Sequence, residues 1–168
     1  MNKLLTKSKP LRKPAPRKRV AKKVAFGSGV VAGQIHGGGA QGAVELSPGK
    51  LIDAIRGGLP ASELETLRIN LGVSMDTLAS RLGISKATLH RRKAEGRLAP
   101  GESDRVLRLA RLLGKAIEVM ESEQAARLWL TSPQVGLGGE VPLDYAKTEV
   151  GAREVEDLLG RIEYGVYS

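Results

Sequence analysis

Basic and hydrogen-bonding side chains gather in one short stretch of the chain, SMDTLASRLGISKATLHRRKAEGR at residues 74–97. At 100° per residue, the second half of this stretch projects one outward helical face that carries Lys86, Ala87, His90 and Arg91. Side chains of these types can read base edges, because Arg and His donate to guanine and Ala contacts a thymine methyl. The stretch therefore predicts a helix that enters the major groove of DNA.

Three neighbouring residues complete the predicted DNA-binding set. Ser85 precedes the helix and is expected, together with Lys86, to meet phosphates or base edges first. Lys93 and Arg97 follow on the same helix and just after it, where we expect them to neutralise phosphates.

A helix-turn-helix would position these side chains. The first helix is predicted over about 74–82, with Leu78, Ala79 and Leu82 facing the core, and Gly83 supplies the left-handed backbone of the turn. Ile84 and Leu89 pack the inner side of the second helix, whereas Arg92 falls where an aliphatic residue is usual, and we expect its guanidinium to reach outward to solvent. The alternative is an amphipathic helical hairpin with a solvated basic face.

Two helices are predicted before this motif, over about 47–58 and 61–72. Ser47 is a candidate N-cap followed by Pro48, and Ser62 with Glu65 has the spacing of a capping box. Gly72 is predicted to end the second of these helices in the left-handed conformation.

The N-terminal segment has a different composition. Residues 1–23 hold ten Lys or Arg and no acid, interrupted by prolines, which predicts a disordered basic arm that contacts phosphates. A solubilising tail or an over-extended gene start remains an alternative. Residues 24–43 are dense in glycine and predict a flexible linker. A nucleotide-binding glycine loop is disfavoured by its spacing, and a secretory signal is disfavoured because glycines interrupt its apolar run.

A long helix is predicted after the motif, with an apolar stripe at Val106, Leu109, Leu113, Ala116 and Met120. Such a stripe either closes a dimer or packs within one subunit. Because helix-turn-helix proteins commonly bind paired half-sites, we expect a homodimer.

The C-terminal third predicts a short helix that ends before Pro133, an extended or turn-like segment over 141–150, and a final helix. Val155, Leu158, Leu159 and Ile162 face inward on that final helix, with its acids outward. The acids make this third anionic: residues 81–115 hold ten basic against three acidic residues, a net of +7, and residues 116–168 hold four against ten, a net of −6. We therefore expect two oppositely charged surfaces and two partners.

Composition excludes several classes of function. The chain has no Cys, which rules out disulfides and thiolate metal sites and favours a reducing cytoplasm. Its few aromatic residues disfavour single-strand and RNA-binding platforms, so double-stranded DNA is the expected nucleic acid. With two scattered His and no nucleophile or metal motif, the chain is predicted not to be an enzyme and to bind no cofactor or metal. No stretch is long and apolar enough for a membrane span.

Two sequence strings, with a junction pattern between them, resemble one known family. ISKATLHRRKAEGRLAPGESDRVLRLARL, a junction with Ala126, Trp129, Leu130 and Pro133, and LGGEVPLDYAKTEVGAREVEDLLGRIEYGVY are similar to the Xre/MbcA/ParS antitoxins. The resemblance implies an all-α fold, a helix-turn-helix joined to a toxin-binding domain, and a non-enzymatic type II antitoxin. Such an antitoxin represses its own operon through operator DNA and occludes a RES-domain toxin that consumes NAD, while binding no NAD itself.

The resemblance implies a toxin-binding surface in the last third of the chain. The acids of this surface, Glu156 and Glu163 among them, would complement a basic pocket that binds dinucleotide phosphates. Its tyrosines and the nearby Val166 would be anchors that insert into the toxin. The predicted toxin-binding residues are Trp129, Pro142, Asp144, Glu149, Glu154, Asp157, Tyr164 and Tyr167. Deletion of residues 141–168 is accordingly expected to abolish neutralisation. The alternative is a stand-alone repressor whose C-terminal domain dimerises or senses a ligand.

Three segments follow from these observations. We predict a disordered basic arm and linker over 1–46, a helix-turn-helix domain with a long dimerisation helix over 47–121, and a toxin-binding domain over 122–168. The DNA-binding role predicts a cytoplasmic, nucleoid-associated protein.

Overall fold

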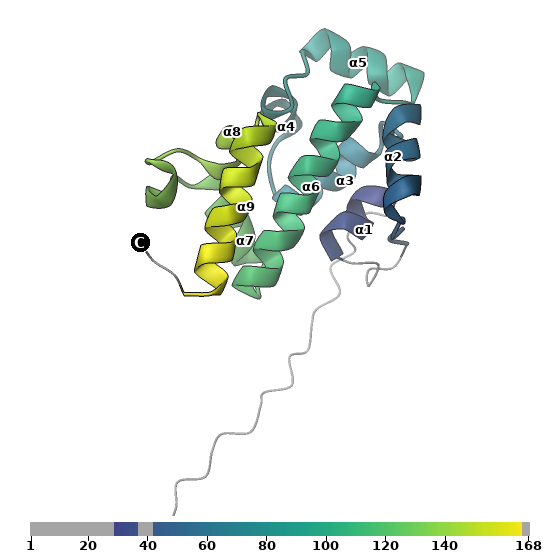
Figure 1. Ribbon diagram of the computed structural model, residues 1–168. Coiled ribbons are helices and arrows are strands. Elements are labelled where there is room, and N and C mark those ends of the chain that lie inside the picture. The colour runs from purple at the N-terminus through teal and green to yellow at the C-terminus, as the bar shows by residue number, and fades with distance from the viewer. Residues whose placement is uncertain (1–28, 37–41, 166–168) are drawn as a thin grey trace, which may run out of the picture.

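The computed structural model describes residues 29–36 and 42–165, which form helices joined by loops and confirm the predicted all-α fold (Figure 1). The elements are α1 Val30–His36, α2 Pro48–Gly57, α3 Glu63–Leu71, α4 Met75–Arg81, α5 Lys86–Glu95, α6 Pro100–Met120, α7 Glu123–Thr131, the 3-10 turn η1 Val135–Leu137, α8 Pro142–Tyr145 and α9 Glu149–Glu163. None of the helices in the described part of the chain has the length and apolar character that a membrane span requires. The predicted basic arm lies outside the described residues.

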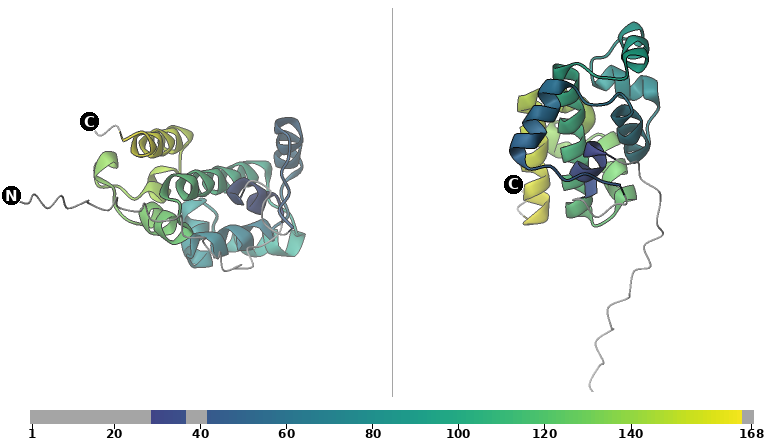
Figure 2. Two further views of the ribbon diagram at one scale, coloured as in Figure 1. Left: turned by 90° about the horizontal axis from the view of Figure 1, so that it is seen from below. Right: turned by 90° about the vertical axis from the view of Figure 1, so that its right-hand side faces the viewer.

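The long helix α6 forms the centre of the molecule. α9 lies along one side of it and α1 and α2 along the other, while α3 and α7 also pack against it (Figures 1 and 2). Val106, Leu109, Leu112, Leu113 and Ala116 are buried by these neighbours. Helices of the same chain thus cover the predicted stripe from Val106 to Ala116, which leaves this part of it unable to form a dimer interface, while the homodimer itself stays a prediction.

Helix α1 corrects the prediction of a flexible linker over 24–43. Residues 30–36 are helical, and Val31, Ala32 and Ile35 are buried against α3 and α6. The glycine content of the segment hid this apolar spacing.

A close approach of backbones explains how α1 reaches α6. Gly114 of α6 faces the main chain of α1, where a Cβ atom would lie 2.6 Å from the carbonyl oxygen of Gln34. A side chain at this position would push the two helices apart.

The N-terminus of α1 is held by a carboxylate from α3. Glu63 is buried and accepts hydrogen bonds from the backbone N–H groups of Val30, at 2.9 Å, and Val31, at 3.0 Å. Burial raises the pKa of Glu63, and the two backbone bonds partly offset that rise. The Glu63 carboxylate thus provides hydrogen-bond acceptors for the backbone N–H groups in the first turn of α1, where the sequence of α1 has no acidic residue.

The ends of α2 and α3 match the predicted positions but not the predicted capping. The capping box at Ser62 is wrong, because the Ser62 side chain makes no cap hydrogen bond and Glu65 pairs with Arg68 instead. The Ser47 side chain makes no cap bond either. Gly72 ends α3 in the left-handed conformation, as predicted.

The last third of the chain adds α7, η1, α8 and α9. The segment predicted as extended or turn-like contains a one-turn helix, α8, which begins at Pro142 because the fixed φ of proline suits a first helical turn. Val155 and Leu159 of α9 are buried in the same cluster that contains Val31 of α1 and Leu78 of α4. The segments on either side of residue 121 therefore share one core.

Candidate functional site

Helices α4 and α5 form the predicted helix-turn-helix. The Ser74 hydroxyl oxygen accepts from the Thr77 N–H at 3.1 Å and begins α4. Gly83 has a φ of +63°, which permits the turn after α4. The apolar positions predicted to face inward are all buried: Leu78, Ala79, Leu82, Ile84 and Leu89.

The outer face of α5 carries the residues expected to read DNA. Ser85 caps this helix by accepting from the Thr88 N–H at 3.1 Å. Lys86, Ala87, His90 and Arg91 are all exposed. These four residues, here called the recognition face, form an uncovered surface on the second helix of the motif.

Among the described residues, the cations of the recognition face are restrained by loose ion pairs alone. Lys86 Nζ lies 3.6 Å from Asp76 Oδ2, and Arg91 Nε lies 3.8 Å from Glu95 Oε1. Exposed pairs of this kind are weak and screened by salt, so a phosphate or a base can replace the carboxylate.

Arg92 fixes α5 to α6. As predicted, its side chain lies on the inner side, but the guanidinium does not reach out to solvent: Nε donates to Glu102 Oε2 at 2.8 Å and Nη1 to Glu95 Oε2 at 2.7 Å. Burial would raise the pKa of Glu102, but bonds from Arg92 and from the Ala99 N–H outweigh it and lower the pKa. An ionised Glu102 therefore holds the recognition helix on α6.

The loop after α5 is fastened to the loop after α2. Arg97 Nη1 donates to the carbonyl oxygens of Gly57, at 3.1 Å, and Gly58, at 2.9 Å. The Leu98 N–H donates to the Leu59 carbonyl at 2.8 Å. Arg97 was predicted to contact phosphates, but in the structure its guanidinium ties two loops together.

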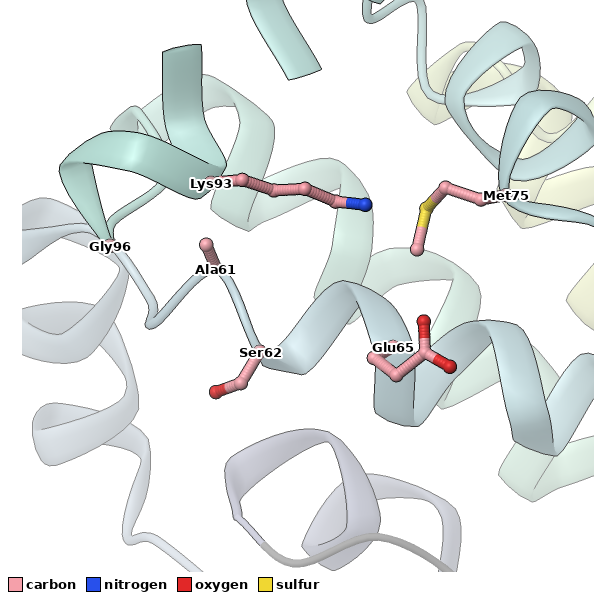
Figure 3. Close-up of a pocket in the computed structure, with 6 residues that line it drawn as sticks. All are labelled: Ala61, Ser62, Glu65, Met75, Lys93 and Gly96. Atoms are coloured by element: carbon pink, nitrogen blue, oxygen red, sulfur yellow. The ribbon is translucent and has the colours of Figure 1, made fainter. Parts of the chain in front are cut away.

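Lys93 also points away from the recognition face. Its side chain extends over a hollow of about 430 Å³ toward Met75, with Glu65 below it (Figure 3). The pKa of Glu65 is lowered mainly by the hydrogen bond from Arg68, and the charge of Lys93 lowers it further. The structure thus brings together four of the seven predicted DNA-binding residues, puts Ser85 at the cap and turns Lys93 and Arg97 elsewhere.

The acids of the last third are mostly paired within the chain. Glu149 binds Arg108 at 2.9 Å, Glu156 binds Arg111 at 2.7 Å and Glu163 binds Lys115 at 2.8 Å, so three pairs join α9 to α6. Asp144 lies 3.4 Å from Arg81 of α4. That these carboxylates face a toxin pocket stays a prediction, and in this chain each of them is already paired with a cation of α4 or α6.

A narrower surface remains on the outer side of α9. Glu154 and Asp157 are exposed and have no ion-pair partner among the residues that the structure describes, and Tyr164 is 79% exposed. At 100° per residue, Val150 and Tyr164 lie within about 40° of each other on this side. We call Val150, Glu154, Asp157 and Tyr164 the outer face of α9.

Other predicted toxin-binding residues are placed differently. Pro142 is buried, so its side chain offers no surface to a partner, and Trp129 is half buried against the core. Tyr167 and Val166 lie outside the described residues.

Sequence reasoning missed three exposed apolar side chains in the C-terminal part of the chain. Val150 is 73% exposed, Leu128 of α7 is 66% exposed and Val135 of η1 is 96% exposed. η1 packs against α9. Their signal in the sequence is weak, because each is a single apolar residue out of phase with the buried stripe of its element.

Two family models match consecutive parts of the chain. The antitoxin Xre-like helix-turn-helix domain matches residues 50–111, and the antitoxin Xre/MbcA/ParS C-terminal toxin-binding domain matches residues 115–165.

Three antitoxins are similar in sequence to this chain. Antitoxin Xre of Yersinia enterocolitica serotype O:8 / biotype 1B is 32% identical over 120 residues, which cover 70% of this chain and 81% of that protein. The Prs ADP-ribosylating antitoxin of Sphingobium sp. (strain YBL2) is 29% identical over 132 residues, 73% of this chain and 83% of that protein. Antitoxin Xre of Photorhabdus laumondii is 34% identical over 88 residues, 51% of this chain and 60% of that protein.

Proposed function

This chain belongs to the Xre/MbcA/ParS antitoxin family, with a helix-turn-helix domain and a toxin-binding domain, and we propose that it neutralises a RES-domain toxin and represses its own operon. It acts by occupying the toxin and the operator rather than by catalysis. The observation that carries this proposal is the presence of two separate exposed faces, the recognition face of α5 and the outer face of α9, on one shared hydrophobic core.

The partner of the outer face of α9 is proposed to be an NAD-consuming toxin. The name of the Sphingobium relative carries the words ADP-ribosylating antitoxin, which supports a partner that handles NAD. Glu154 and Asp157 offer unneutralised carboxylates to a basic dinucleotide pocket, and Val150 and Tyr164 offer apolar contact beside them.

A charge reversal on α9 tests toxin binding. The chain is co-expressed with the toxin of its neighbouring gene, and growth and co-purification are measured. Asp157→Arg is expected to abolish protection, because it puts a cation against a basic pocket. Asp53→Arg, on exposed α2 on the other side of α6, is the matched control and should protect like the wild type.

The two outcomes separate the proposal from its alternative. Protection by the Asp157→Arg variant would place the toxin contact elsewhere. A chain that binds DNA but neither protects nor co-purifies with a toxin would be a stand-alone repressor. Deletion of residues 141–168 is a poorer test than sequence analysis indicates, because it removes the core residues Val155 and Leu159 along with the outer face of α9.

A further inference from the structure

A small cavity lies where α4, α6 and the loop between α8 and α9 meet. Its volume is about 160 Å³, and it is lined by Ser80, Arg81, Leu82, Gly83, Arg105 and Lys147. Three of these six residues are cationic. We call this cavity the α4–α6 cavity.

Two of the residues that line this cavity carry a buried guanidinium nitrogen with no hydrogen-bond partner among the described residues: Arg81 Nη1 and Arg105 Nε. The Arg81 side chain is only 13% exposed, and its other terminal nitrogen, Nη2, lies 3.4 Å from Asp144 Oδ2. Buried donors are nearly always paired, since an unpaired one gives up its hydrogen bond to water without replacement. Both nitrogens therefore require an acceptor that the described residues do not supply.

The charges around the cavity leave a positive excess. Asp144 is shared between two of the cations, because its Oδ1 lies 3.1 Å from Lys147 Nζ while its Oδ2 faces Arg81. Burial would raise the pKa of Asp144, but Lys147 and Arg81 outweigh it and lower the pKa, so one carboxylate stands against three cations. Glu102 attracts Arg105 as well, but its Oε2 already accepts from Arg92 and from a backbone N–H.

The lining selects an oxyanion. Guanidinium and ammonium groups only donate, and the guanidinium fork matches the oxygens of phosphate. The cavity is about five times the roughly 30 Å³ that one water occupies, and well below the roughly 300–1,000 Å³ of pockets that enclose whole small molecules. It has room for one phosphate group and a few waters.

We propose that the α4–α6 cavity is a binding site for a phosphate group, carried by inorganic phosphate or a small phosphorylated metabolite, and bridging the two domains. Arg81 and Arg105 lie in the part matched by the helix-turn-helix model, and Lys147 lies in the part matched by the toxin-binding model. A phosphate held by all three would fix α4 and α6 against the loop before α9. The anion thereby joins the DNA-binding and toxin-binding parts.

The other source of the same chemistry is a backbone phosphate of operator DNA. Arg81 projects about 140° around α4 from Asp76, at 100° per residue. Asp76 contacts Lys86 at the start of the recognition helix, whereas Arg81 contacts Asp144 of α8. Figure 1 shows α8 beside α4, on the side away from the C-terminal end of α5. The cavity thus faces the toxin-binding part, which favours the free phosphate.

Titration of the full chain with inorganic phosphate, at constant ionic strength adjusted with chloride, tests the proposal. Calorimetry is expected to show saturable binding, and the unfolding temperature should rise with phosphate concentration. Lys147→Gln, at a half-exposed position that the fold tolerates, should weaken binding at least about tenfold, as removal of a charge-assisted hydrogen bond does. Arg105→Gln should do the same. Lys50→Gln removes an equal charge from exposed α2 and should leave binding unchanged.

A second arm distinguishes the source of the phosphate. Binding to the operator fragment is measured at several salt concentrations for the wild type and for Lys147→Gln. If the wild type ignores inorganic phosphate but Lys147→Gln lowers the salt slope by about 1, the occupant is a DNA phosphate. The proposal is overturned if neither effect appears, or if the wild type and Lys147→Gln bind phosphate equally well. The phosphate arm needs no toxin, so failure of toxin neutralisation does not bear on it.

Discussion

Three consecutive cations show how neighbours decide what a residue does. Arg91 is exposed on the recognition face, Arg92 is bound to Glu102 on the inner side, and Lys93 extends over the hollow beside Glu65. Each step along α5 turns the side chain by about 100°, so adjacent residues of like charge meet different surroundings. Of the three, only Arg91 is free to contact a base.

Replacement of Arg91 by Ala is expected to weaken operator binding by about 1–3 kcal/mol and to relax base preference at one position, since the bases lose a donor. A gel-shift titration against single-base operator variants measures both effects. Arg153→Ala, an exposed cation on α9, serves as the charge-matched control. Unchanged affinity and preference in the Arg91 variant would remove it from the DNA interface.

The buried pair of Arg92 and Glu102 predicts acid sensitivity. Because the pKa of Glu102 in the folded chain is lower than its ordinary value of 4.5, the folded state binds fewer protons than the unfolded state just below that pH. The stability that this carboxylate contributes is therefore complete above pH 4.5 and lost as the pH falls through the folded pKa.

A Glu102→Gln variant is expected to unfold at a lower temperature at pH 7 and to lose less further stability between pH 5 and pH 3 than the wild type. Thermal unfolding at each pH measures this. Glu154→Gln, which changes an exposed carboxyl with no ion pair among the described residues, should follow the wild-type curve. Parallel curves for Glu102→Gln and the wild type would contradict the assigned role of the pair.

Among the helices, α6 is the common support. α5 is attached to its N-terminal end through Arg92 and Glu102, α1 lies on one side, and three ion pairs fasten α9 along another side. The helix-turn-helix model begins at residue 50 and the toxin-binding model at residue 115, so α1 precedes both matched parts. Its burial indicates that it stabilises the scaffold rather than acting as a tether.

Two Gly→Ala substitutions distinguish the effect of α1 packing on stability from the effect of helix propensity. Gly114→Ala is expected to destabilise the chain by about 1–3 kcal/mol, because the added Cβ meets the backbone of α1. Gly160→Ala, at a position of α9 with nothing within 4 Å, should instead stabilise it by about 0.5–1 kcal/mol. Denaturant unfolding gives both values. Stabilisation by both substitutions would mean that α1 is not seated on α6.

Over the molecule as a whole, charge is distributed in three parts rather than two. Ten cations precede residue 24, the helix-turn-helix part is strongly basic, and the last third is acidic in sequence. Much of that negative charge is neutralised within the chain, because Glu149, Glu156 and Glu163 form ion pairs with cations of α6. The charge that remains available to a partner is therefore smaller than the net charge of the segment.

Removal of residues 1–28 tests the contribution of the first ten cations to DNA binding. The expected result is a smaller dependence of affinity on salt, since the slope falls by about 0.9 for each DNA phosphate that the protein no longer neutralises. The unfolding temperature should stay constant, because α1 and Glu63 are retained. Binding at several salt concentrations and thermal unfolding check the two parts, and an unchanged slope would exclude the arm from the DNA interface.

The local features of this protein could be predicted from its amino-acid sequence alone. The helix-turn-helix was predictable because its signals lie within one short stretch: a serine cap before each helix, apolar residues at helical spacing and Gly83 at the turn. The family could be identified for the same reason, since its motifs are contiguous strings. The outer face of α5 followed from helical geometry.

Long-range packing, in contrast, determines what each helix contacts and which charges remain free. The stripe on α6 faces its own chain and not a second copy, the glycine-rich segment contains α1, and Arg97 binds two carbonyl groups 39 and 40 residues away. These outcomes depend on contacts between residues far apart in the chain, and a carboxylate or an apolar stripe carries no local sign of its partner. Contacts between residues far apart in the chain are thus the part of this structure that its sequence alone does not predict.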